Sequence, residues 1–229
     1  MECYDTLHYS FHFHSGSVAQ RDIQKIAQGQ EACYQYICRV LGIAPDLRIE
    51  YFLCDTPEEV GEIYGDDEPC NGFACAPDKI YAVYNDLIKC IGFHEDAHLI
   101  SYTINRPDCP AVREGLAMYF DRRWWGIHNM DWAMYYQEQG MLLSVDSLLD
   151  REVFFSQDCS ITYPIMGAFT DFLISSWGIE RYKRVYGMAD SRAALYEIYG
   201  SAVFREFESW LLLFRLDDGV KQRIVELLN

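Results

Sequence analysis

Apolar and polar residues alternate near the start of the chain, which is the pattern of a half-buried β-strand. Over residues 4–14, Tyr9, Phe11 and Phe13 fall on one face of such a strand and polar residues fall on the other. Residues 65–79 read as a loop with room for a short strand at 72–76. Further strands are predicted at residues 47–53 and 80–84.

Apolar residues at helical spacing follow, and capping residues mark where the helices begin and end. Ser17 opens a long helix as part of a capping box, and Gly42 ends it. Thr56 and Pro57 mark the start of a second helix. Later helices are predicted at residues 87–104, 110–124, 131–139, 163–177, 179–186, 192–199 and 202–213, with a last piece near the C-terminus. The pattern predicts an α/β subdomain over residues 1–104 and a helical subdomain over residues 105–229.

The predicted helix over residues 87–104 carries the sequence His-Glu-Asp-Ala-His, an H-E-x-x-H motif. On a helix, His94 and His98 lie four residues apart on one face, where both imidazoles can bind a single Zn²⁺. Glu95 points slightly off their axis, so it reaches the water that the metal activates more easily than the metal itself. The motif therefore indicates metal-assisted hydrolysis.

A hydrolytic zinc site needs a third protein ligand and an open position for water. Glu114 lies in the otherwise apolar helix predicted at residues 110–124. The segment between His98 and Glu114 is long enough for the motif helix to end, turn and return as a second helix. We therefore predict Glu114 as the third ligand, with Asp108 and Asp121 as alternatives.

These residues resemble the gluzincin branch of the zinc metallopeptidases. The H-E-x-x-H motif followed by E-G-x-A at Glu114 is most similar to the peptidase MA-like proteins. The stretch Y-P-I-M-G-A-F beginning at Tyr163 is similar to a helix that follows the zinc helices in that family. The resemblance covers residues 80–213, and the first seventy residues match only as a strand–helix–strand lead-in.

The resemblance implies a zincin-like metalloprotease fold of the α+β class, with a small mixed sheet in the N-terminal half and an all-helical C-terminal half. It implies His94, His98 and Glu114 as zinc ligands and Glu95 as the general base. It also suggests Tyr163 as a donor to the transition state.

The chain departs from the thermolysin-like pattern in two respects. The gap before Glu114 is shorter, and Met118 lies where those enzymes have an aspartate that supports a ligand histidine. The residues that support the ligands therefore stay unassigned. The sequence also lacks a Gly-x-Met-Glu-Asn motif, so nothing in it favours an aminopeptidase.

Composition restricts the partners and the compartment. The chain has 229 residues, 19 basic against 35 acidic, and a formal net charge of −16. This balance argues against binding to nucleic acid or to anionic membranes, which both require clustered Lys and Arg. No signal peptide or transmembrane run is expected. The nine cysteines are interpreted as mostly reduced thiols of a cytoplasmic protein, although Cys70 and Cys75 are spaced to pair or to bind metal.

The predicted function is that of a zinc-dependent metallopeptidase acting on a peptide or protein substrate. An edge strand at residues 72–76 or 80–84 is a candidate for pairing with an extended substrate by β-addition. The alternatives are an amidase or esterase that uses the same site, a silent zinc-stabilised binding module, or a protein without a metal. The pattern leaves the oligomeric state open.

Overall fold

The apolar residues of the first predicted strand are buried in the structure, a computed structural model that describes residues 1–65 and 68–228. The prediction of one strand over residues 4–14 is wrong in extent, because the chain forms an antiparallel pair, β1 (Glu2–Asp5) and β2 (Tyr9–Phe13). The backbone N–H of Thr6 donates to the carbonyl of Tyr9 at 2.9 Å and closes the turn between them.

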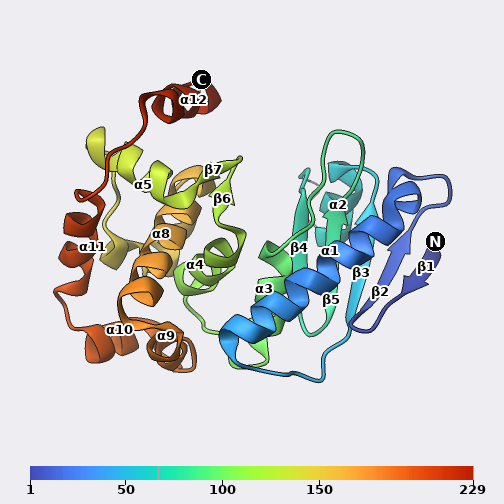
Figure 1. Ribbon diagram of the computed structural model, residues 1–229, viewed down its shortest axis with the longest axis horizontal. Coiled ribbons are helices and arrows are strands. Elements are labelled where there is room, and N and C mark those ends of the chain that lie inside the picture. Colours follow the sequence, from blue (N-terminus) through green and yellow to red (C-terminus); the bar gives the residue numbers. More distant parts are fainter. Residues whose placement is uncertain (66–67, 229) are drawn as a thin grey trace. The chain divides into compact units, whose positions relative to one another are not determined.

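A mixed five-stranded sheet results, with the strand order β1-β2-β3-β5-β4 (Figure 1). Parallel pairing joins β2 to β3 (Ile49–Cys54) and β3 to β5 (Lys79–Val83). The short strand β4 (Gly72–Cys75) pairs antiparallel with β5 and forms one edge of the sheet. Asp66 and Asp67, inside the predicted loop over residues 65–79, lie outside the described residues.

The predicted caps of the first two helices are confirmed. In α1 (Val18–Leu41), the Ser17 side chain accepts a hydrogen bond from the Gln20 N–H, and Gly42 adopts a left-handed φ of 63° after the last turn. In α2 (Pro57–Tyr64), the Thr56 side chain accepts from the N–H of the third helical residue. Both caps satisfy N–H or C=O groups that a helix end leaves without partners.

The motif helix begins later than predicted. Helix α3 spans His94–Tyr102, so the prediction that it starts at residue 87 is wrong. The Asn85 side chain accepts hydrogen bonds from the N–H groups of Leu87 and Ile88, which favours a turn there. Gly92 then adopts a φ of 134°, which is outside the helical region. The helix consequently begins at the motif itself.

The C-terminal half of the chain is helical apart from one small ribbon. Helix α4 spans Pro110–Asp121 and ends where Arg122 adopts a left-handed φ of 66°. Its predicted extension to residue 124 is wrong, because Trp124 belongs to β6 (Arg123–Trp124), which pairs with β7 (Ile127–His128). The following helices are α5 (Asn129–Glu138), α6 (Val145–Leu148), α7 (Arg151–Ser156), α8 (Cys159–Trp177), α9 (Ile179–Tyr186), α10 (Ser191–Tyr199), α11 (Val203–Leu211) and α12 (Asp218–Leu228).

Helix α8 begins at Cys159, four residues before the predicted start, so Pro164 lies inside it. An internal proline leaves the carbonyl four residues earlier without its helical donor. Here that carbonyl belongs to Ser160, and the buried Tyr136 hydroxyl donates to it at 2.9 Å. A tertiary hydrogen bond thus replaces the missing helical one.

Contacts within the chain divide it into two compact units, Met1–Ile104 and Asn105–Asn229. The N-terminal unit is α+β with the mixed sheet, and the C-terminal unit is helical.

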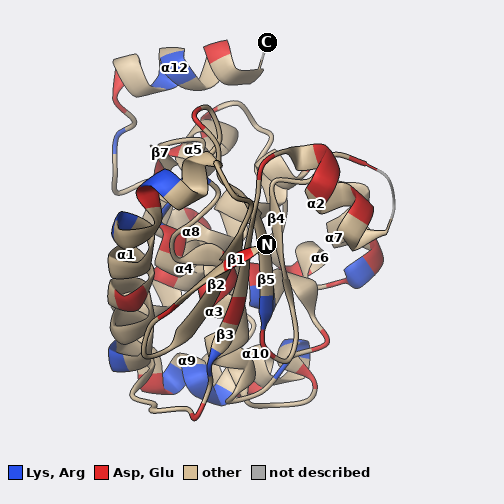
Figure 2. Ribbon diagram, turned by 90° about the vertical axis from the view of Figure 1, so that its right-hand side faces the viewer, with Lys and Arg blue, Asp and Glu red and all other residues tan. Residues whose placement is uncertain are grey.

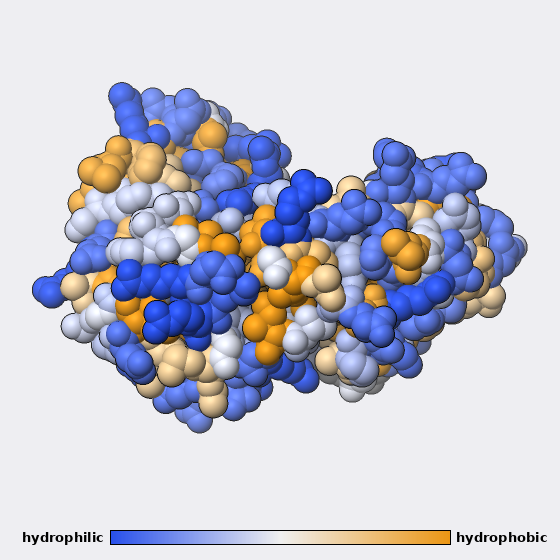
Figure 3. Space-filling model, turned by 60° about the horizontal axis from the view of Figure 1, so that its bottom comes forward, coloured by the Kyte–Doolittle hydropathy of each residue, from blue (hydrophilic) through white to orange (hydrophobic). Residues whose placement is uncertain are grey.

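Figure 2 shows Lys and Arg scattered among more numerous Asp and Glu. On the face drawn in Figure 3, hydrophobic residues gather in patches separated by hydrophilic ones. Within the described residues, no helix has the length and apolar character needed to cross a bilayer.

Two glycines allow α4 and α8 to approach closely. A Cβ at Gly167 on α8 would lie 2.5 Å from Asn129 Nδ2 and 2.7 Å from Met118 Cβ. A Cβ at Gly115 on α4 would lie 2.6 Å from Thr170 Oγ1 and 3.1 Å from the carbonyl oxygen of Met166. The residue next to Glu114 is therefore held directly against α8.

We expect Gly167→Ala to destabilise the protein by about 1–3 kcal/mol, because the added methyl group must displace buried neighbours. Urea unfolding of the whole protein measures this. The matched control is Gly29→Ala, since Gly29 is an exposed helical glycine of α1 with no atom within 4 Å of its added Cβ. That substitution should stabilise by about 0.5–1 kcal/mol. Equal effects of the two substitutions would contradict the close-packing explanation.

Candidate metal centre

The two histidines of the motif lie on adjacent turns of α3. Their ring centroids are 5.1 Å apart and the rings are nearly perpendicular. His98 is buried, with 6% of its surface exposed, whereas His94 is partly exposed at the beginning of the helix. The spacing of four residues places both imidazoles on the same helix face, as the motif predicts.

Tyr102, one turn further along α3, contacts the second histidine. Its hydroxyl lies 3.4 Å from His98 Nδ1, and the Ser101 hydroxyl donates to the His98 carbonyl at 3.1 Å. A metal bound through Nε2 would leave the Nδ1 N–H facing the Tyr102 oxygen, and such a contact fixes the tautomer of a ligand histidine. The sequence analysis did not identify Tyr102, although its spacing of four residues from His98 was a usable signal.

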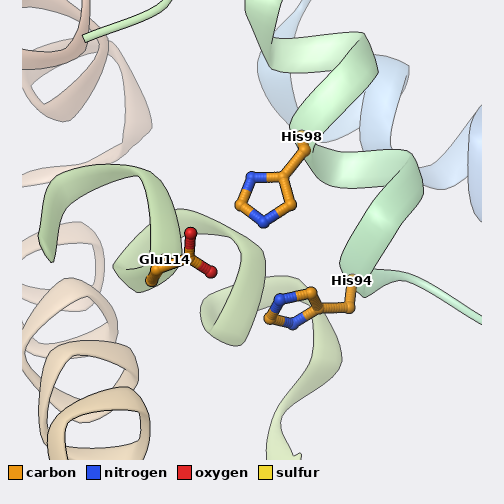
Figure 4. Close-up of side chains that lie close together, drawn as sticks. All are labelled: His94, His98 and Glu114. Carbon is orange, nitrogen blue, oxygen red and sulfur yellow. The ribbon is translucent and has the colours of Figure 1, made fainter. Parts of the chain in front are cut away.

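Glu114 is the third member of the group that the structure assembles. One ligand atom from each of His94, His98 and Glu114 can be chosen so that all three lie within 4.8 Å of one another. Figure 4 shows the three side chains directed toward a common point, two from α3 and one from α4. Among residues 1–65 and 68–228, no other set of three His, Cys, Asp or Glu residues lies as close together. The alternative ligands Asp108 and Asp121 are not in it.

The donor set fits a catalytic zinc ion. Two histidines and one carboxylate are the ligands of one known class of hydrolytic zinc site, in which a fourth position stays open for water. A tetrahedral ion with bonds of about 2.1 Å separates its ligand atoms by roughly 3.4 Å. Atoms that already lie within 4.8 Å can reach that separation by side-chain movements of about 1 Å.

The two predicted catalytic residues lie in different surroundings. Glu95 is partly exposed in the first turn of α3, next to His94. Tyr163 lies within α8 rather than at the beginning of a helix, so the prediction of its position is wrong. Its ring contacts Trp124, with centroids 5.4 Å apart, and stacks on Phe154 at 5.9 Å.

Asp96, between the two histidines in sequence, is completely buried. Its Oδ2 accepts hydrogen bonds from the Tyr9 hydroxyl at 2.6 Å and from Gln30 Nε2 at 2.9 Å. Its Oδ1 has no hydrogen-bond partner among the described residues. Burial raises the pKa of Asp96 well above its usual range, against the opposing effect of these two hydrogen bonds. The sequence analysis treated this position only as a variable residue of the motif.

A comparison with protein-family models gives no match, and a comparison with curated proteins gives no significant match. The motif and the geometry of the three grouped residues therefore carry the evidence for function.

We expect the purified protein to bind one equivalent of Zn²⁺. The Glu114→Gln variant should bind Zn²⁺ at least about tenfold more weakly, because it loses the carboxylate ligand and keeps only the two histidines. Competition with a chromophoric chelator measures the affinity. Asp121→Asn is the control, since it removes a carboxylate of the same helix outside the group. Weaker binding by the control and unchanged binding by Glu114→Gln would place the third ligand elsewhere.

Proposed function

We propose that the protein is a zinc-dependent metallopeptidase of the gluzincin type. The observation that carries the proposal is the convergence of His94, His98 and Glu114 within 4.8 Å, with Glu95 adjacent to the first ligand. A structural zinc site is usually closed by four protein ligands, whereas this group has three. The motif also keeps a carboxylate next to the metal position, which a purely structural site does not require.

Each residue has a separate role in the proposed reaction. Zinc, when bound by the three ligands, supplies a Lewis acid that lowers the pKa of water and polarises the scissile carbonyl. Glu95 takes a proton from the attacking water and passes it to the leaving amine as the peptide bond breaks. Tyr102 holds the His98 ring through its Nδ1, and Tyr163 is the proposed donor to the transition state.

The zincin-like fold is part of the same proposal. A mixed sheet followed by a metal-binding helix and a helical half supports it. The edge strand β4 packs against α3, and among the described residues it pairs with β5 alone, so we propose its other edge for pairing with an extended substrate. The alternative strand over residues 80–84 is excluded from this role, because β5 pairs with β3 and β4 on its two sides.

We also infer a cytoplasmic location and a peptide or protein substrate. The nine cysteines, including Cys70 and Cys75, form no disulfides among the described residues, which suits a reducing compartment. The scattered distribution of Lys and Arg supports the expectation that neither nucleic acid nor an anionic membrane is a partner.

The test compares the wild type with Glu95→Gln in hydrolysis of a quenched fluorescent peptide library. We expect the substitution to lower the turnover number by about 10²–10⁴-fold while zinc content stays unchanged, because the base is lost and the ligands remain. Removal of zinc by a chelator should abolish the activity of the wild type, and added Zn²⁺ should restore it.

Parallel assays with ester and acyl-amide substrates determine which class of bond the protein hydrolyses. Faster turnover of these substrates than of any peptide would indicate an amidase or esterase. Zinc binding without turnover of any substrate would instead favour a binding module. Equal rates for the wild type and Glu95→Gln would contradict the assigned role of the base.

A further inference from the structure

The buried carboxylate of α3 joins three elements of the N-terminal unit. Asp96 lies on α3, Tyr9 on β2 and Gln30 on α1, and all three side chains are at most 1% exposed. The Tyr9 hydroxyl is 2.6 Å from Asp96 Oδ2 and 3.1 Å from the backbone oxygen of Gln30, so its proton has two acceptors within reach. The three residues therefore form one connected network.

The same network holds the backbone that precedes the helix. Gln30 Nε2 donates to Asp96 Oδ2 at 2.9 Å and to the carbonyl of Gly92 at 3.0 Å. Gly92 and Asp96 lie on either side of His94 in the sequence. Gln30 therefore binds both ends of the five-residue segment that contains the first metal ligand. No side-chain cap fixes the start of α3 at Phe93.

Helix geometry places Asp96 on the face of α3 opposite the metal ligands. At 3.6 residues per turn, Asp96 lies about 200° around the helix from His94 and about 160° from His98. Rotation of α3 by about 10° would displace a side-chain atom roughly 6 Å from its axis by about 1 Å. A metal site tolerates a misplacement of about 0.5 Å, so the orientation of this short helix has to be fixed.

Stability alone does not account for a carboxylate at this position. A fully buried acid with one oxygen that has no partner among the described residues is costly, and an apolar side chain of similar size would pack there without that penalty. Directional hydrogen bonds, unlike apolar packing, specify a single rotation of the helix. We propose that Asp96, held by Tyr9 and Gln30, is a positioning residue that sets the rotation of α3 and thereby aims His94 and His98 at the metal.

This inference rests on the proposed metal site, and its test uses a pair of matched variants. Tyr9→Phe removes the hydroxyl that binds Asp96. Tyr34→Phe removes the hydroxyl of another buried tyrosine, on α1, which donates to the carbonyl of Leu47 at 3.0 Å, away from α3. Each variant loses one hydrogen-bonded hydroxyl of a buried tyrosine in the same unit, so a general loss of stability affects both.

We expect both variants to lower the urea midpoint of the metal-free protein. Only Tyr9→Phe should weaken Zn²⁺ binding, by about tenfold or more, and change the d–d absorption spectrum of the Co²⁺-substituted protein, because only it changes the geometry of the ligands. Gln30→Met removes the other donor to Asp96 Oδ2, so it should resemble Tyr9→Phe in both readouts, and it is the second variant if Tyr9→Phe does not fold.

Identical Zn²⁺ affinities and Co²⁺ spectra for Tyr9→Phe and Tyr34→Phe would overturn the positioning role and leave the metallopeptidase proposal intact. Absence of Zn²⁺ binding by the wild type would instead overturn the metal site itself, and the positioning role with it. The two failures are therefore distinguishable by the wild-type titration.

Discussion

The buried hydrogen bond between Asp96 and Tyr9 constrains how the elements of the N-terminal unit can pack together. A buried carboxylate is tolerated only where donors reach it, so β2, α1 and α3 must meet in one relative arrangement. Tyr9 is in turn opposite Ile49 in the parallel pairing of β2 with β3. The helix that carries the candidate metal ligands is thereby tied to the register of the sheet, through side chains that are inaccessible to solvent.

Local signals predicted the elements whose ends are determined by adjacent residues. The caps at Ser17 and Thr56 and the terminating Gly42 could be read directly, because each acts on backbone groups a few positions away. The start of α3 could not be predicted in this way. Apolar spacing continues through residues 87–93, but the Asn85 side chain accepts hydrogen bonds from backbone N–H groups at the expected start of the helix and favours a turn. Here a local polar competitor overrides a helical pattern.

The start of α8 shows a second limit of sequence reasoning. A proline normally marks the first turn of a helix, and the helix predicted over residues 163–177 would place Pro164 there. Its position in the helix interior depends on the Tyr136 hydroxyl, a partner twenty-eight residues away in the sequence. At the metal group, the spacing of His94 and His98 was evident from the motif, whereas the burial of Asp96 was not, because it depends on residues near the start of the chain. Assignment of the three grouped residues as zinc ligands stays a prediction.

The close approach of α4 and α8 makes their contact residues mutually dependent. The Cα of Gly167 faces the side chains of Met118 and Asn129, and Asn129 Nδ2 donates to the carbonyl of Met118 at 2.8 Å. A larger residue on α8 becomes acceptable only when one of the two facing side chains is reduced or redirected. These positions therefore vary together. Single substitutions at them would each be poorly tolerated, whereas paired substitutions would reveal combinations that compensate for one another. The same epistasis would limit which sequences can evolve next to Glu114.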